Sequence, residues 1–234
     1  MSEQAIDFDK NSPVGGKQYD TLIAKALPGY DIMHSIALAC LRSQLSEKAD
    51  LLIVGAGTGM ELIKFAEGNY QWKMLGIDPS VNMLSIAQDK INHSGLSERV
   101  QLFQGYTQDL PTDSVYDAAT AILVMHFIPD DGSKLAFLQS ISQRLKLSAS
   151  FILVDVFGEK GSDELEKIIS ILHCFWEETG ISAEKRVELI ESFHKGVYPI
   201  PEARVWELLQ QAGFGNILRF YTGLWVGGWV ATKI

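Results

Sequence analysis

The sequence predicts a doubly wound α/β fold organised around one mostly parallel β-sheet. The apolar run 51–54 leads straight into three glycines spaced two apart, and a helical pattern follows. This order indicates a buried strand, a tight turn and the start of a helix. Between residues 50 and 156, strand-like and helix-like segments alternate, which is typical of parallel strands joined by crossovers. Two β-rich runs, 216–221 and 224–232, predict a closing antiparallel hairpin.

A chain of 234 residues suits one α/β domain, and no linker-like stretch divides it. We therefore treat residues 1–234 as a single domain. The helices expected between residues 158 and 200 interrupt the strand–helix alternation and predict a lid or a dimer surface. The parts of the domain are an N-terminal arm with helices (1–49), a ligand-binding core (50–157), a helical insertion (158–200), and a C-terminal helix with the hairpin (201–234).

The periodicity predicts each element in turn. Residues 1–17 are polar and predict an arm, helix 19–26 follows, and Asp31 is expected to N-cap a helix over 32–45. The expected core strands are 50–54, 72–77, 100–104, 118–125 and 150–156, and the expected core helices are 60–67, 81–93 and 131–145. Further helices are expected over 162–179, 182–194 and 203–212.

Composition and charge exclude several classes of function. The net charge of −9 leaves no electrostatic footprint for bulk nucleic-acid binding. The apolar run 118–128 is too short to cross a bilayer, and the polar, acidic N-terminus is unlike a signal peptide. Cys40 and Cys174 lie in apolar helical contexts and predict buried free thiols, which fits a cytoplasmic protein. The histidines have no metal-ligand spacing, so no metal is expected.

The glycine turn and the end of the second strand predict a ligand site. Because glycine has no Cβ, the turn at Gly55, Ala56, Gly57 and Gly59 lets backbone N–H groups approach a ligand closely. Asp78 ends the second strand roughly twenty residues later, where a carboxylate can accept both hydroxyls of a ribose. The carboxyl ends of parallel strands share one edge of the sheet, so these groups are expected to lie together.

Two later segments reach the same edge. After the third strand come Gln104, Tyr106 and Thr107, which could hold an adenine. The fourth strand leads to Leu123 and His126. Histidine titrates near neutral pH, so His126 is a candidate general base, and the alternative is a cavity-lining residue without a proton role.

These motifs together resemble the class I S-adenosylmethionine-dependent methyltransferases. The matching residues are Val54-Gly55-Ala56-Gly57-Thr58-Gly59, Gly76-Ile77-Asp78, Asp117-Ala118 and the run from Leu123 to Pro129. The resemblance implies a Rossmann-like methyltransferase fold, with a seven-stranded mostly parallel sheet, a C-terminal antiparallel hairpin and an inserted helical lid. It also implies S-adenosyl-L-methionine as the cofactor.

A narrower resemblance connects the arm and the insertion to another cofactor. Phe8-Asp9-Lys10-Asn11, Leu27-Pro28-Gly29-Tyr30 and Glu184-Lys185-Arg186 are similar to the carboxymethyltransferases that form 5-oxyacetic acid on tRNA wobble uridine. Those enzymes use carboxy-S-adenosyl-L-methionine. The resemblance implies that Arg186 binds the extra carboxylate and that Tyr30 lies at the cofactor. The sequence departs from this family's pattern at Tyr106, Ile122 and His126.

The cofactor-binding residues expected from these arguments are Tyr19, Tyr30, Gly55, Ala56, Gly57, Gly59, Asp78, Pro79, Met83, Gln104, Tyr106, Thr107, Leu123 and Arg186. The expected reaction is methyl transfer from S-adenosyl-L-methionine to an unidentified small-molecule acceptor. One alternative is carboxymethyl transfer to tRNA, and another is a cofactor-binding protein without catalysis. A homodimer is expected from the apolar helices of the insertion.

Overall fold

The computed structural model describes residues 8–10, 16–111 and 115–234. Most of the arm expected over residues 1–17 lies outside these described residues. In the described part of the chain, no helix is both long enough and apolar enough to cross a lipid bilayer.

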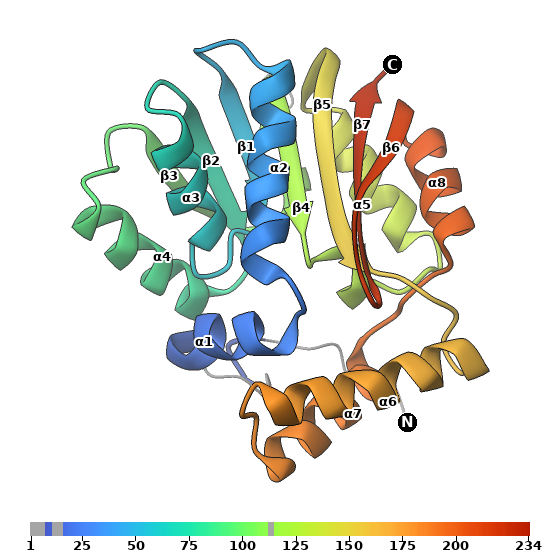
Figure 1. Cartoon of the computed structure of the whole chain (residues 1–234). Coiled ribbons are helices and arrows are strands. Elements are labelled where there is room, and N and C mark those ends of the chain that lie inside the picture. The colour runs from blue at the N-terminus through green and yellow to red at the C-terminus, as the bar shows by residue number, and fades with distance from the viewer. Residues whose placement is uncertain (1–7, 11–15, 112–114) are drawn as a thin grey trace.

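Within the described residues, seven strands form one sheet in the order β3-β2-β1-β4-β5-β7-β6 (Figure 1). The first five strands run parallel, while β7 is antiparallel to both β5 and β6. The predicted fold class is therefore confirmed. The strands are β1 (Asp50–Val54), β2 (Lys73–Asp78), β3 (Val100–Gln104), β4 (Tyr116–Ile122), β5 (Leu145–Val156), β6 (Phe214–Gly223) and β7 (Val226–Lys233).

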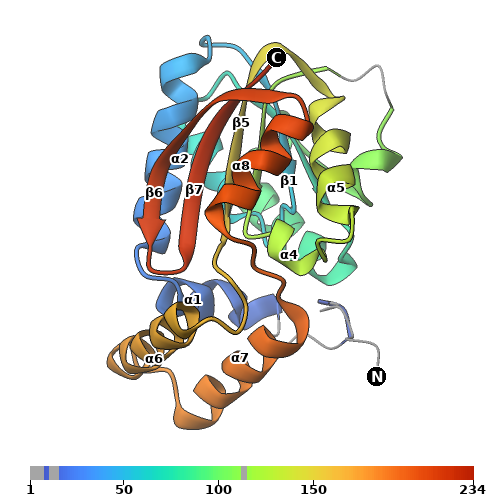
Figure 2. The same ribbon diagram turned by 90° about the vertical axis from the view of Figure 1, so that its right-hand side faces the viewer.

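Helices cover both faces of the sheet, and the alternation of side chains along β1 explains why. Leu51 and Ile53 point into one apolar cluster, whereas Leu52 and Val54 point into another. The first cluster packs against α2 (Tyr30–Gln44), α3 (Met60–Gly68) and α4 (Val81–His93). The second packs against α5 (Ser133–Ser142) and α8 (Glu202–Gln211). In Figure 2, α2 lies on one side of the sheet and α5 and α8 lie on the other.

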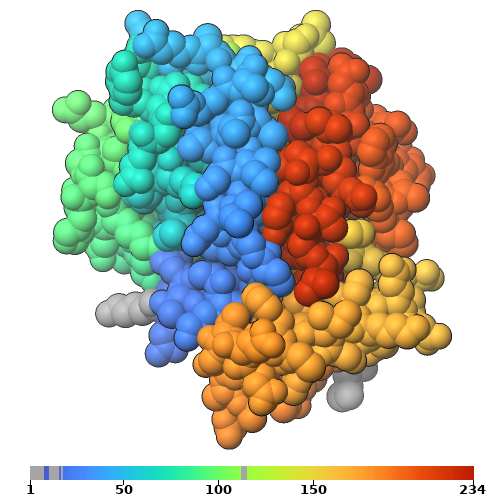
Figure 3. Space-filling model, in the orientation of Figure 1, coloured from blue at the N-terminus to red at the C-terminus, as the bar shows by residue number. Residues whose placement is uncertain are grey.

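Three helices lie beyond the carboxyl ends of the parallel strands. They are α1 (Gly16–Ala26) and the two helices of the predicted insertion, α6 (Asp163–Glu178) and α7 (Ala183–Gly196). We call α6 and α7 the lid. Figure 3 shows the lid against α1, and Trp176 Nε1 of the lid donates a hydrogen bond to the carbonyl of Ala26 at 2.8 Å. The lid therefore covers the edge of the sheet at which a ligand site was expected.

Several predicted boundaries are wrong. Strand β4 ends at Ile122 instead of residue 125, because Leu123 has a left-handed φ of 61° and a short 3-10 helix, Met125–Phe127, follows. Helix α5 ends at Ser142, so β5 already begins at Leu145.

Two residue-level expectations are also wrong. Helix α2 begins at Tyr30 with Gly29 as its N-cap, so Asp31 lies in the first turn instead of capping it. Cys40 is only partly buried and Cys174 is exposed, although both thiols are free. Asp117, by contrast, has a structural role: it accepts a hydrogen bond from the Asp50 N–H at 2.9 Å, far from the carboxyl edge.

Candidate functional site

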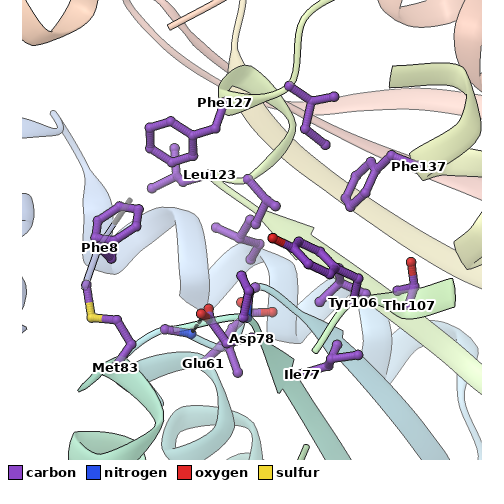
Figure 4. A pocket seen from close by; sticks show the side chains of 18 of the residues that line it. Phe8, Glu61, Ile77, Asp78, Met83, Tyr106, Thr107, Leu123, Phe127 and Phe137 are labelled. Atoms are coloured by element: carbon purple, nitrogen blue, oxygen red, sulfur yellow. Dashed lines mark hydrogen bonds between the residues drawn. The ribbon is translucent and has the colours of Figure 1, made fainter. Parts of the chain in front are cut away.

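A cavity of about 450 Å³ opens at the carboxyl ends of β1, β2 and β4. The strand order reverses between β1 and β4, and open α/β sheets bind ligands at such a switch point. In Figure 4, Phe8 and Phe127 lie on one side of this first cavity and Tyr106 and Phe137 on the other. Of the residues expected at a cofactor, the first cavity is lined by Tyr19, Tyr30, Gly55, Ala56, Gly57, Asp78, Pro79, Met83, Tyr106, Thr107 and Leu123.

The three glycines of the turn have left-handed φ values but different surroundings. A Cβ added at Gly55 would lie 2.2 Å from Val124 Cγ2, and one at Gly59 would lie 3.0 Å from Ala87 Cβ. At Gly57 the nearest atom would be 3.9 Å away. Gly55 therefore permits packing against the loop after β4, and Gly59 permits packing of α3 on α4 outside the cavity lining. Gly57 leaves its open side to the first cavity.

Asp78 joins the glycine turn to the end of β2. Its Oδ2 accepts the Gly57 N–H at 2.9 Å, and its Oδ1 accepts the Ser80 N–H at 2.8 Å. The N-cap of α4 is Ser80, whose Oγ accepts the Met83 N–H. Burial raises the pKa of Asp78, the two backbone hydrogen bonds oppose this rise, and the charge of Asp9 adds to it. Each oxygen retains a lone pair for a ligand hydroxyl.

The loop after β3 reaches the same cavity. Tyr106 is 57% exposed at its wall, while Thr107 is buried and its hydroxyl is hydrogen-bonded to Ser140 of α5. Gln104 is exposed on β3 and lies outside the cavity lining. Phe137 of α5 also lines the cavity and was not predicted, because nothing in the local sequence distinguishes it from core residues of the helix.

Glu61 is a buried carboxyl group that the sequence reasoning missed. It lies in the first turn of α3, is 5% exposed, and accepts a hydrogen bond from the Thr120 hydroxyl. Burial raises the pKa of Glu61 to about 8, against the opposing effect of that hydrogen bond. Its position was a usable signal, because Glu61 comes two residues after Gly59 and directly precedes the apolar Leu62.

Tyrosines from α1 and α2 line the same cavity as Glu61. Tyr30 lines the cavity, and its ring meets the His34 ring edge-on at 4.5 Å. Burial raises the pKa of Tyr19 and of Tyr30 well above the usual tyrosine value, so both hydroxyls stay protonated. The pKa of His34 is lowered, chiefly by burial. The inner end of the cavity thus carries neutral donors and acceptors.

The described residues of the arm dock onto α4 and onto the cavity. Asp9 accepts hydrogen bonds from the Val81 and Asn82 N–H groups, each at 3.1 Å, and so caps the start of α4. Phe8 meets Tyr19 and Phe127 edge-on, with ring centroids 5.9 and 5.6 Å apart. The arm therefore supplies one wall of the first cavity.

His126 lies outside the first cavity. It sits on the 3-10 helix after β4, and its Nδ1 is hydrogen-bonded to Asp155 of β5. It lines a second cavity of about 140 Å³ beneath the lid. This second cavity shares Phe8, Tyr19, Leu123 and Phe127 with the first.

Arg186 lines neither cavity. It belongs to α7, its side chain is 11% exposed, and its Nη2 is 3.8 Å from a Glu177 carboxylate oxygen of α6. Its Nη1 donates to the Ile181 carbonyl at 3.3 Å, and its buried Nε has no partner among the described residues. Here the guanidinium joins the two lid helices to each other.

Comparison with known proteins identifies the class. Residues 51–148 match a family described as a methyltransferase domain. Together with the fold, this match supports a class I S-adenosylmethionine-dependent methyltransferase. Solved structures share the fold: a methyltransferase from Aquifex aeolicus has a TM-score of 0.62 at 19% identity, over 96% of this chain and 100% of that one. Another from Methanosarcina mazei has a TM-score of 0.61 at 19% identity, over 83% and 97%.

Curated relatives extend over almost the whole chain. A carboxy-S-adenosyl-L-methionine synthase of Staphylococcus epidermidis is 25% identical over 224 residues, which is 93% of each protein. Carboxy-S-adenosyl-L-methionine synthase 1 of Yersinia pseudotuberculosis is 25% identical over 217 residues, covering 90% of this chain and 87% of the relative. The names of these relatives contain carboxy-S-adenosyl-L-methionine, the compound that the carboxymethyltransferases use. However, the names describe the synthesis of this compound and not its use.

Proposed function

We propose that this enzyme transfers the methyl group of S-adenosyl-L-methionine to a small-molecule acceptor. The observation that carries the proposal is that no cationic side chain is found in the described lining of the first cavity. Its described lining includes the carboxyl groups of Glu61 and Asp78 and no Lys or Arg. A sulfonium compound with an ammonium group suits such a lining, whereas an additional carboxylate would find no cation there.

The cavity fits the cofactor in three places. Asp78 can accept the ribose hydroxyls while the open side of Gly57 lets the chain of the cofactor pass close to the backbone. Tyr106, Phe137 and Ile77 offer apolar surface for adenine. Glu61 and Tyr30 lie at the inner end, where they can hold the amino group of the methionine part.

The cofactor supplies the activated methyl group, and the protein holds the cofactor and the acceptor in the orientation that the transfer requires. Methyl transfer is an in-line displacement, so the acceptor must be held on the side of the methyl group away from sulfur. Phe8, Leu123 and Phe127 stand between the two cavities and exclude water from that region. A small acceptor is supported by the size of the second cavity, about 140 Å³. The net charge of −9 argues against tRNA as the acceptor, because binding of a phosphate backbone depends on cationic side chains.

The second candidate function uses or makes carboxy-S-adenosyl-L-methionine. It is supported by the names of the relatives and by Arg186. Arg186 lies on α7 one turn before Leu189, which lines the second cavity, and its buried Nε lacks a described partner. A rotation of this side chain away from Glu177 would make its guanidinium available to a carboxylate.

Mass spectrometry of the ligand released from the purified enzyme distinguishes the two candidates. S-Adenosyl-L-methionine or S-adenosylhomocysteine is expected, because the first cavity lacks a described cation. Recovery of carboxy-S-adenosyl-L-methionine would reject our proposal in favour of the second candidate. If no ligand co-purifies, thermal stabilisation by each compound at equal concentration gives the same comparison.

A further inference from the structure

The second cavity has the character of an acceptor site. It lies between α1, the lid and the turn that joins β6 to β7, and its exposed lining is almost entirely apolar. It adjoins the first cavity through four shared residues, so a ligand within it would face the reactive end of the cofactor. This step rests on the proposed function, which places the cofactor in the first cavity. The wall specific to the second cavity includes Ala26, His126, Trp176, Leu189, Phe193 and Trp225.

The size and the apolar lining of the second cavity suit a ligand with a single aromatic ring. A cavity of about 150 Å³ lined by apolar side chains is known to bind benzene, which is close to the 140 Å³ found here. The Trp225 ring lies 4.7 Å from the Phe193 ring and 6.3 Å from the Trp176 ring, so the wall offers aromatic faces and edges. A six-membered aromatic ring matches this space, whereas a ribose or a phosphate would lose its hydrogen bonds to water there.

Two polar groups in the wall of the second cavity, on His126 and Trp225, can orient a bound aromatic ring. His126 is 6% exposed, and its Nδ1 is hydrogen-bonded to Asp155, which is 1% exposed and also accepts the Val156 N–H at 2.9 Å. This pairing directs the Nδ1 proton toward Asp155 and leaves Nε2 as an acceptor. No hydrogen bond joins Nε2 to another described residue. The Trp225 Nε1–H is buried and likewise has no partner in the described part of the chain.

We propose that the second cavity binds a small phenolic acceptor and that His126, held by Asp155, takes the proton of its hydroxyl. In this step the hydroxyl proton passes to Nε2 of His126, and the phenolate oxygen forms a bond to the methyl carbon. The carbon–sulfur bond breaks and its electron pair stays on sulfur. The products are an aryl methyl ether, S-adenosylhomocysteine and an imidazolium that Asp155 stabilises.

Calorimetric titration with phenol tests the cavity. Enzyme loaded with S-adenosylhomocysteine is expected to bind phenol, and Ala26→Leu is expected to weaken that binding at least about tenfold by filling the space. Ala136→Leu, the same change on the exposed face of α5, serves as the control. Absence of phenol binding, or binding that Ala26→Leu leaves unchanged, would overturn the assignment. Failure of S-adenosylhomocysteine to bind would instead reject the proposed function, and phenol titration of the cofactor-free protein would still test the cavity.

A second measurement tests His126. The variant His126→Asn keeps an amide donor toward Asp155 and removes the acceptor at Nε2. With saturating S-adenosyl-L-methionine at pH 8, methyl transfer to phenol is expected to slow by roughly 100-fold or more. Transfer to pentafluorophenol, which is already ionised at this pH, should slow far less. Equal slowing of both would exclude a proton role, and no transfer to either phenol by the unaltered enzyme would exclude a phenolic acceptor.

Discussion

The N–H of Gly57 donates a hydrogen bond to Oδ2 of Asp78 at 2.9 Å, which ties the glycine turn after β1 to the end of β2. The same carboxylate is therefore part of the backbone architecture and faces the first cavity. Any variant of Asp78 tests both roles, so cofactor binding and folding must be measured together.

Asp78→Asn is expected to weaken S-adenosylhomocysteine binding at least about tenfold, because it replaces one of the two acceptor oxygens, each of which already accepts a backbone N–H, with an NH2 donor. Calorimetric titration measures this loss. Asp117→Asn makes the same chemical change at the opposite edge of the sheet, where the side chain accepts the Asp50 N–H, and should leave the affinity unchanged. Similar affinities for the two variants would contradict a ribose role for Asp78.

Glu61 should make the protein less stable as the pH rises. The unfolded chain releases this proton near pH 4.5, whereas the folded protein keeps it up to about pH 8. Between these values the folded state binds more protons, so the free energy of unfolding contributed by Glu61 falls with increasing pH, by on the order of 5 kcal/mol in total. Urea denaturation of the protein and of Glu61→Gln at pH 5.5 and pH 8 measures the difference.

In the variant Glu61→Gln this contribution is absent, so its stability relative to the unaltered protein should rise with pH. Other titrating groups are common to both proteins and cancel in the comparison. A stability difference that does not change with pH would show that the Glu61 pKa is not raised.

Gly55→Ala should destabilise the fold by about 2–5 kcal/mol. The added Cβ meets Val124 Cγ2 at 2.2 Å, and the φ of 72° is strained for alanine. Gly95→Ala has a similar φ of 66° but no atom within 4 Å of the added Cβ, so only the strain of about 1–2 kcal/mol remains. Chemical denaturation compares the two, and equal losses would refute close packing at Gly55.

Asp9→Ala should release the arm from α4. The variant loses the acceptor for the Val81 and Asn82 N–H groups, which costs about 1 kcal/mol of capping. Hydrogen exchange at these two amides should become faster. Asp89→Ala removes a negative charge from the middle of the same helix and is the control. Unchanged exchange in Asp9→Ala would indicate that the arm does not cap the helix.

Arg186→Ala addresses the choice between cofactors. If the first cavity holds S-adenosyl-L-methionine, this variant should bind it with unchanged affinity, since Arg186 lines neither cavity. Competition between S-adenosyl-L-methionine and its carboxylated form is the measurement. A selective loss of affinity for the carboxylated compound would support the second candidate function.

The sheet and part of the first cavity could be predicted because their signals are local. Each strand and helix has its own periodicity, and parallel strands necessarily bring their carboxyl ends to one edge. The glycine turn and Asp78 were predicted in this way, and both reach the first cavity. Gln104, Gly59, His126 and Arg186 do not line it, because the register of a loop, and the direction in which each side chain points, depend on packing.

The sequence by itself determined the order of the elements, the confirmed fold class and the edge of the sheet at which a ligand site would form. Only the tertiary structure paired His126 with Asp155, placed Phe8 between the two cavities, and separated His126 from the glycine turn. These relationships join residues far apart in the chain. Their geometry is decided by burial and shape in the folded protein, which periodicity does not encode.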